Sequence, residues 1–167
     1  MDGPGFVIEA SEAESMAKQS CLTVLQLLPA LVQSAQALAR SPISNYHVGA
    51  VGLGSSGRIF LGCNLEFPGL PLHHSVHAEQ FLITNLTLNA EPSLKYVAVS
   101  AAPCGHCRQF FQEIRHAHDV QILITGDSIN NQSGKNDLTS TQQFEPLSCL
   151  LPHRRCFVTK WYLCFLR

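Results

Sequence analysis

Three residues of the types that build catalytic metal centres stand in two short clusters of the sequence. His77 lies 27 residues before Cys104, and Cys107 follows three positions later. At a helix start, cysteines at i and i+3 share one face, and the helix N-terminus stabilises the thiolates that Zn²⁺ requires. The neutral imidazole of His77 supplies a third ligand. Three protein ligands leave the fourth tetrahedral position to water, which is the pattern of a catalytic zinc site.

Glu79 lies two positions after His77, beside the expected metal but not among its ligands. Within a helix, these two side chains would point in nearly opposite directions. They converge on one pocket only if His77 keeps non-helical dihedral angles at the helix start. The pair therefore predicts a helix that begins near Val76, with Glu79 as a general acid and base.

Each of these residues also has a simpler interpretation. The two cysteines alone fit buried small hydrophobes or a redox pair, and His77 with Glu79 fits an ordinary helix start. A closed structural zinc site is the main rival, with His106, His74 or Cys63 as the fourth ligand. That arrangement would leave Glu79 without a purpose, so the open, catalytic site is favoured.

The order H-x-E followed by P-C-x-x-C is the signature of zinc-dependent base deaminases. The stretch from residue 44 to about residue 125 resembles the catalytic domain of cytidine deaminases. It is most similar to the class whose chains hold two homologous domains and whose zinc is bound by one His and two Cys. The matching segments are YHVGA at 46–50, NLEF at 64–67, VHAEQ at 76–80 and APCGHCRQF at 102–110.

The resemblance implies an enzyme that hydrolyses cytidine or deoxycytidine to the uracil nucleoside and ammonia. It also implies one Zn²⁺ per catalytic domain, held here by His77, Cys104 and Cys107. Such a metal lowers the pKa of its bound water toward about 7. The family's carboxylate, here Glu79, accepts that proton, delivers it to N3 of the base and later protonates the departing amine.

The resemblance implies substrate-binding residues as well. In the family, the Asn and Glu of the N-x-E-F motif hold a ribose hydroxyl, and these are Asn64 and Glu66 here. The aromatic residue of the F-x-V-G-A motif stacks near the pyrimidine, and Tyr46 occupies that position. Asn64 and Glu66 are i and i+2 on a strand end, so both face one side. Without the resemblance, a solvated charge is the favoured interpretation of Glu66. For Tyr46, a core residue remains an equally good interpretation.

Composition argues against several other classes of function. The chain has 167 residues and a formal net charge of −1, without the basic stripe expected of a tRNA or single-stranded DNA deaminase. No run approaches the roughly 18 apolar residues of a membrane span, and no signal peptide is read at the N-terminus. The seven cysteines fit reduced thiols in the cytoplasm. We therefore expect a cytoplasmic protein acting on small nucleosides, with no nucleic-acid or membrane partner. We also expect a homodimer, because the face that a second domain or partner subunit would cover favours association. An inactive or truncated zinc-binding paralogue is the alternative.

Periodicity and turn residues predict an α/β protein. Two capping-box patterns open the first two helices, at Ser11 with Glu14 and at Thr23 with Gln26, and Pro29 should kink or restart the second helix. The predicted helices are 11–20, 23–41, 75–89 and 104–116, and the predicted strands are 46–53, 58–67, 95–101 and 120–125. The economical arrangement is a three-layer α/β/α sandwich with a mixed sheet of about five strands, of which the last two are parallel.

The sequence also suggests boundaries. We expect an amino-terminal helical extension over 1–42 and a catalytic domain over 43–152, with a polar surface loop at 126–146. Residues 153–167 form an atypical tail that holds the single Trp and basic residues without acidic ones. Two interpretations of this tail compete, an added strand or the product of a truncated or misread coding sequence, and the abrupt shift in composition favours the second.

Overall fold

Helices and strands alternate along the chain much as the periodicity predicts. In this computed structural model, the structure describes residues 5–126 and 143–150. The helices are α1 (Ala10–Gln19), α2 (Val24–Ala37), α3 (Ala78–Leu88) and α4 (Gly105–Phe111). The strands are β1 (Val7–Ile8), β2 (Gly49–Gly54), β3 (Ile59–Cys63), β4 (Leu94–Val99), β5 (Gln121–Ile124) and β6 (Glu145–Pro146). Short 3₁₀ helices lie at η1 (Leu72–His74), η2 (Ala117–Asp119) and η4 (Leu147–Leu150).

The strands form one mixed sheet in the order β1-β3-β2-β4-β5-β6. The β4–β5 pair is parallel, as predicted for strands joined by a helical crossover, and the other pairs are antiparallel. The sheet has six strands where the sequence predicts about five. The added edge strands β1 and β6 have two residues each, which is too short for alternation to reveal them.

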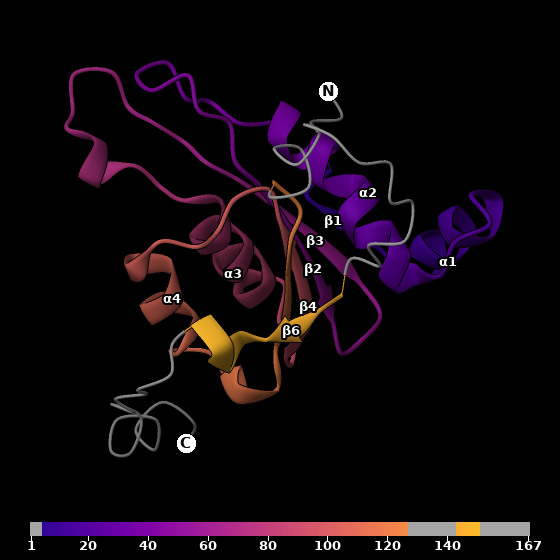
Figure 1. Cartoon of the computed structure of the whole chain (residues 1–167). Coiled ribbons are helices and arrows are strands. Elements are labelled where there is room, and N and C mark those ends of the chain that lie inside the picture. The colour runs from indigo at the N-terminus through magenta and orange to yellow at the C-terminus, as the bar shows by residue number, and fades with distance from the viewer. Residues whose placement is uncertain (1–4, 127–142, 151–167) are drawn as a thin grey trace, which may run out of the picture.

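Alternating side chains give the sheet two buried faces. Val51, Ile59 and Leu61 pack with α1 and α2, whereas Phe60 and Val97 pack with α3 on the other face. Figure 1 shows the sheet between α1 and α2 on one side and α3 and α4 on the other. The predicted three-layer α/β/α sandwich is therefore confirmed. In the part of the chain that the structure describes, no helix is long and apolar enough to cross a membrane.

The predicted helix starts meet different outcomes. The Thr23 capping box is present, with Gln26 returning the bond to the Thr23 backbone. The Ser11 prediction is wrong, because α1 begins at Ala10 after a Glu9 cap that makes no side-chain bond. Pro29 neither ends nor restarts α2, which runs through it as one helix. Burial of one face of α2 against the sheet offsets the single hydrogen bond that Pro29 removes.

Several predicted elements are shorter than expected, among them the helix predicted over 23–41, which ends at Ala37. The strand predicted over 46–53 begins only at Gly49, and the strand predicted over 58–67 ends at Cys63. The helix predicted over 104–116 ends at Phe111, and His116 takes a left-handed φ of 57° before η2. Most of the predicted 126–146 loop and the whole 153–167 tail lie outside the described residues.

Candidate active site

The first turn of α3 brings His77 and Glu79 to one pocket. His77 caps α3 with extended dihedral angles (φ −80°, ψ 154°), so the side chains two positions apart converge, as predicted from their spacing. Gly62 of β3 lies directly beneath this turn. A Cβ atom at Gly62 would come within 2.3 Å of the Ala78 carbonyl oxygen, so only glycine lets α3 rest this closely on the sheet.

The first turn of α4 brings the two cysteines to the same place. Cys104 caps α4 with extended dihedral angles (φ −67°, ψ 171°), and Cys107 is buried one turn later. The Nδ1 atom of His77 lies 3.5 Å from the Sγ atom of Cys104 and 3.3 Å from that of Cys107. All three ligand atoms lie within 4.8 Å of one another. Two helix starts, far apart in the sequence, thus converge on a single point.

This donor set fits a zinc ion. Zn–S bonds of about 2.3 Å and Zn–N bonds of about 2.0 Å place N and S atoms roughly 3.5 Å apart across a tetrahedron, which matches the two separations given above. Burial raises the pKa of the Cys107 thiol, and the nearby Glu79 carboxylate raises it further. A bound cation is therefore what would stabilise the thiolate here, since metal binding releases the ligand protons.

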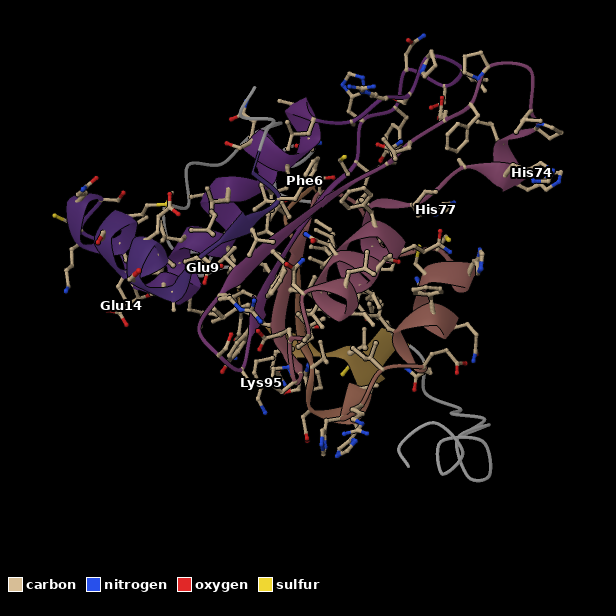
Figure 2. All side chains as sticks on the ribbon, turned by 180° about the vertical axis from the view of Figure 1, so that it is seen from behind. Phe6, Glu9, Glu14, His74, His77 and Lys95 are labelled. Carbon is tan, nitrogen blue, oxygen red and sulfur yellow. The ribbon has the colours of Figure 1, made fainter. Side chains whose placement is uncertain are left out.

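The structure offers no fourth protein ligand among the residues that it describes. The group within reach of one metal consists of His77, Cys104 and Cys107 alone. The ring of His106 faces the Gln80 amide instead, with nitrogen–nitrogen distances of 3.3 and 3.4 Å. Figure 2 shows His74 on the outer part of a loop, away from His77. The closed, four-ligand alternative therefore has no support in these residues.

The last candidate for a fourth ligand, Cys63, takes a structural place. Cys63 is buried in β3, where burial raises the pKa of its thiol. Another group of ligand types, His116, His118 and Asp119, lies exposed at η2 and does not line the pocket. Cys63 thus behaves as the small buried strand residue that its surroundings suggest.

Glu79 is held close to the metal-binding group without joining it. Its side chain is buried at the start of α3, and the Sγ atom of Cys107 donates to its Oε2 atom over 3.3 Å. Gln80 steadies the turn, because its Oε1 atom accepts the His77 backbone N–H at 3.0 Å. A buried carboxylate in this position can take up and release protons beside the metal.

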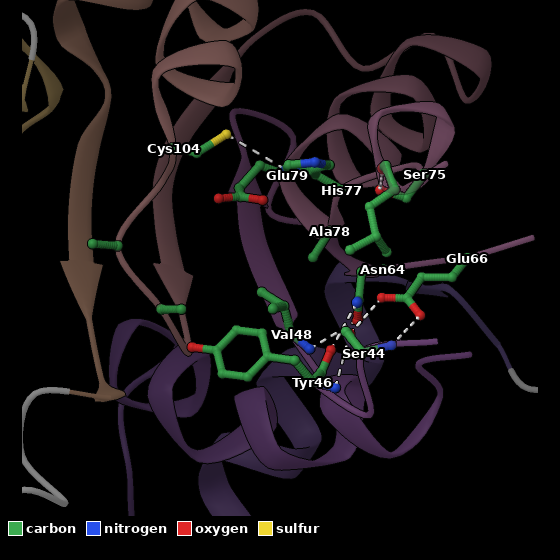
Figure 3. A pocket seen from close by; sticks show the side chains of 13 residues that line it. Ser44, Tyr46, Val48, Asn64, Glu66, Ser75, His77, Ala78, Glu79 and Cys104 are labelled. Carbon is green, nitrogen blue, oxygen red and sulfur yellow. Dashed lines mark hydrogen bonds between the residues drawn. The ribbon is translucent and has the colours of Figure 1, made fainter. Parts of the chain in front are cut away.

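His77, Glu79 and Cys104 line one end of a pocket of about 390 Å³ (Figure 3). Its lining consists of Ser44, Tyr46, Val48, Asn64, Glu66, Leu72, Ser75, His77, Ala78, Glu79, Ala101, Ala102 and Cys104. Figure 3 shows His77, Glu79 and Cys104 at one end and Ser44, Asn64 and Glu66 at the other. The pocket therefore has a metal-binding end and a polar end, at a size that suits a small molecule.

Asn64 and Glu66 are buried side chains at the polar end of the pocket. Their exposed fractions are 9% and 8%, so Glu66 is not the solvated charge that its position alone would suggest. The hydrogen bond from the Ser44 hydroxyl is the largest cause that lowers the pKa of Glu66, and the backbone N–H groups of Ile43 and Ser44 act in the same direction. Glu66 is therefore held as a carboxylate.

Tyr46 lines the pocket but is not a core residue. Its side chain is 60% exposed, which contradicts the alternative that it fills the interior. Figure 3 shows its ring extending away from Asn64 and Glu66. That placement is compatible with stacking on a base, and the stacking role stays a prediction.

Sequence reasoning misses several lining residues. Ser44 reaches Glu66 across 22 positions of sequence, and no motif marks either Ser44 or Leu72. The positions of Ala101 and Ala102, directly before Pro103 and the cysteine motif, are a signal that could predict them as lining residues. Loop residues without periodicity give no signal of the pocket that they line.

Comparisons with known proteins find a zinc-binding deaminase family. A family model described as the cytidine and deoxycytidylate deaminase zinc-binding region matches residues 23–124. Cytidine deaminase 1 of Arabidopsis thaliana is 61% identical over 154 residues, covering 92% of this chain and 50% of that protein. The cytidine deaminase of Shewanella halifaxensis (strain HAW-EB4) is 40% identical over 146 residues, covering 87% of this chain and 44% of that protein.

Solved structures share the fold. The cytidine deaminase from Mycobacterium tuberculosis has a TM-score of 0.59 at 25% identity, covering 76% of this chain and 93% of that chain. The enzyme from Mycobacterium leprae has a TM-score of 0.61 at 23% identity, covering 77% and 97%. This chain spans about half the length of the two curated relatives above. From the match over 23–124 and the 61% identity, the chain belongs to the cytidine and deoxycytidylate deaminase zinc-binding family.

Proposed function

We propose that this chain catalyses the zinc-dependent hydrolytic deamination of cytidine or deoxycytidine, giving uridine or deoxyuridine and ammonia. The observation that carries the proposal is the buried Glu79 carboxylate in a pocket, next to a three-ligand metal-binding group. A structural zinc site needs no such carboxylate and no pocket. The pairing is what hydrolysis of a C–N bond by an activated water requires.

His77, Cys104 and Cys107 would hold the Zn²⁺, one per catalytic domain. When bound, the metal supplies Lewis acidity that lowers the pKa of water toward about 7. Glu79 takes the proton that this water loses and delivers it to N3 of the pyrimidine. The oxygen of that water would add to C4, and Glu79 would then carry its remaining proton to the amine, so that the C4–N bond breaks and ammonia leaves. Its burial beside the ligands fits this role, because one carboxylate must reach both the water and the base.

The other end of the pocket selects a nucleoside. We assign Asn64 and Glu66 to a sugar hydroxyl and the ring of Tyr46 to one face of the pyrimidine. The three residues line the pocket together, and the two polar side chains are buried there. The net charge of −1 gives no general attraction for nucleic acid, so a free nucleoside is the favoured substrate.

The finer assignments follow from this activity. Deamination of free nucleosides would place the chain in cytoplasmic pyrimidine salvage, where its cysteines stay reduced. A homodimer is proposed because apolar side chains lie exposed beside the pocket, namely Phe67, Leu70 and Leu72. Exposed apolar groups of this kind favour association with a second copy.

An assay of ammonia release tests the proposal. The purified full chain is given cytidine, deoxycytidine or a cytosine-containing oligonucleotide, and zinc is measured on the same sample. We expect about one zinc per chain and ammonia from the nucleosides but not from the oligonucleotide. Ammonia released only from the oligonucleotide would identify a nucleic-acid deaminase. A zinc-loaded chain without activity on any of these would identify an inactive paralogue.

A further inference from the structure

Residues 43–48, here called the strap, are held mainly by the side chains of Asn64 and Glu66, together with one backbone bond from the Asn64 N–H to the Val48 carbonyl oxygen at 3.2 Å. At one end, the Oε2 atom of Glu66 accepts the backbone N–H groups of Ile43 and Ser44 at 2.8 and 3.0 Å. The Oε1 atom of Glu66 accepts the Ser44 hydroxyl. This is why the strand predicted from residue 46 begins only after the strap.

Asn64 attaches the other end of the strap. Its Oδ1 atom accepts the Val48 backbone N–H at 2.8 Å, and its Nδ2 group donates to the Tyr46 carbonyl oxygen at 2.9 Å. The two residues assigned to the sugar therefore also fix the position of Tyr46, which is assigned to the base. Sugar recognition and the shape of the strap depend on the same side chains.

The Ser44 hydroxyl connects these two functions. It donates to Glu66 and accepts the Tyr46 backbone N–H at 3.0 Å, so one small group ties the carboxylate to the strap. Ser44 itself lines the pocket. Removing its hydroxyl would free one oxygen of Glu66 and leave the Tyr46 N–H without this acceptor.

Counting donors and acceptors shows what remains for a ligand. A carboxylate offers about four lone-pair sites, and Ile43 and Ser44 occupy three of those on Glu66. An amide NH₂ offers two donors, and the Tyr46 carbonyl takes one from Asn64. One acceptor site and one donor are left. A single hydroxyl group, which donates and accepts one hydrogen bond each, matches that pair.

We propose that Ser44 is a positioning residue that sets the selectivity of the pocket for a sugar hydroxyl. The inference rests on the proposed function, since it takes the ligand to be a nucleoside. By directing two of the lone pairs of Glu66 toward the strap, through its backbone N–H and its hydroxyl, Ser44 keeps the remaining site aimed at the pocket. A nucleoside without that hydroxyl gains nothing from this arrangement.

Binding to two nucleosides tests the inference without turnover. Dissociation constants for cytidine and 2′,3′-dideoxycytidine are measured by calorimetry on the zinc-loaded full chain carrying Glu79→Gln. Adding Ser44→Ala should weaken cytidine binding about tenfold, the scale of one lost hydrogen bond to a charged group, and change dideoxycytidine binding less than twofold. Ser44→Thr, which keeps the hydroxyl, should recover most of the loss. Ser15→Ala, an exposed serine of α1, is the matched control.

Steady-state kinetics of the chain that keeps Glu79 add a second readout. Ser44→Ala should raise KM for cytidine while kcat stays within about twofold, because Ser44 does not contact the reacting atoms. Equal weakening of both nucleosides would show a merely structural role and overturn the inference, as would unchanged binding of both. A zinc-loaded parent chain that binds neither nucleoside would instead overturn the proposed function itself.

Discussion

At the scale of single residues, the proposed chemistry centres on Glu79. Its carboxylate is buried beside the three metal-binding side chains and contacts the thiol of Cys107 without being part of the group. The two-residue spacing of His77 and Glu79 and the predicted helix start are sufficient to predict this placement. The contact with Cys107 is a tertiary detail that spacing does not reveal.

Glu79→Gln should keep the zinc and the fold but lose turnover. Glutamine has nearly the same shape and cannot carry a proton between water and base. Loss of general acid–base catalysis typically costs about 10²–10⁴-fold in rate, and more when one group serves several steps. Comparison of kcat, zinc content and Tm with those of the unaltered chain makes the check. Activity near that of the unaltered chain would refute the assigned role.

Cys107→Ala should lose metal and stability together. A three-ligand site has no spare donor, and metal binding is coupled to folding. We expect less than one zinc per chain and a lower Tm, with no further change on adding a chelator. Cys21→Ala is the matched control, because Cys21 is exposed and outside the metal-binding group. One tightly bound zinc and an unchanged Tm in Cys107→Ala would show that the ligand set is wrong.

At the scale of elements, local signals predict the site-bearing helices better than the segments between them. The Thr23 capping box is found because both of its bonds are local, and the start of α3 follows from His77 and Glu79. The strap is missed as a separate segment, since its backbone partners are Asn64 and Glu66, 16 or more positions away. Hydrogen bonds at such separations leave no trace in periodicity.

The turn between β2 and β3 is fixed by a buried carboxylate that the sequence analysis does not single out. The fully buried side chain of Glu91 forms an ion pair with Arg58 at 2.9 Å and accepts bonds from Ser55 and Ser56. Burial opposes ionisation of Glu91, but the hydrogen bonds from Ser56, Arg58 and Ser55 outweigh it, and the pKa of Glu91 is lowered. Glu91 thus anchors the turn to the end of α3.

Glu91→Gln should destabilise the chain at neutral pH by about 2 kcal/mol, the scale of a lost charge-assisted hydrogen bond. Because the folded pKa lies below the unfolded one, this stabilisation is complete above the unfolded pKa, near 4.5, and is lost as pH falls through the folded pKa. Urea unfolding at pH 7 and below pH 4 measures the difference. Glu14→Gln, on exposed α1, is the control, and a pH-independent difference would exclude the linkage.

At the scale of the whole molecule, the pocket of the proposed active site has an apolar neighbour. A second pocket of about 660 Å³ shares Glu66 with the first and is lined by Phe67 and Phe81 among others. Phe67 begins the loop that also carries the exposed Leu70 and Leu72, and Leu72 lines the active-site pocket itself. A partner that covers this loop would therefore also help to enclose the substrate.

Leu70→Glu should weaken self-association of the chain. Leu70 is 50% exposed, and a carboxylate there would have to lose its hydration when a second copy covers the loop. Sedimentation velocity over a concentration series should show a dimer for the unaltered chain and a shift toward monomer for Leu70→Glu. Leu22→Glu is the control. Leu22 is exposed and follows α1, in the opposite layer, so this change should leave the dimer intact. If Leu70→Glu sediments as the unaltered chain does, a second copy does not cover this loop, and the proposed dimer must use another face.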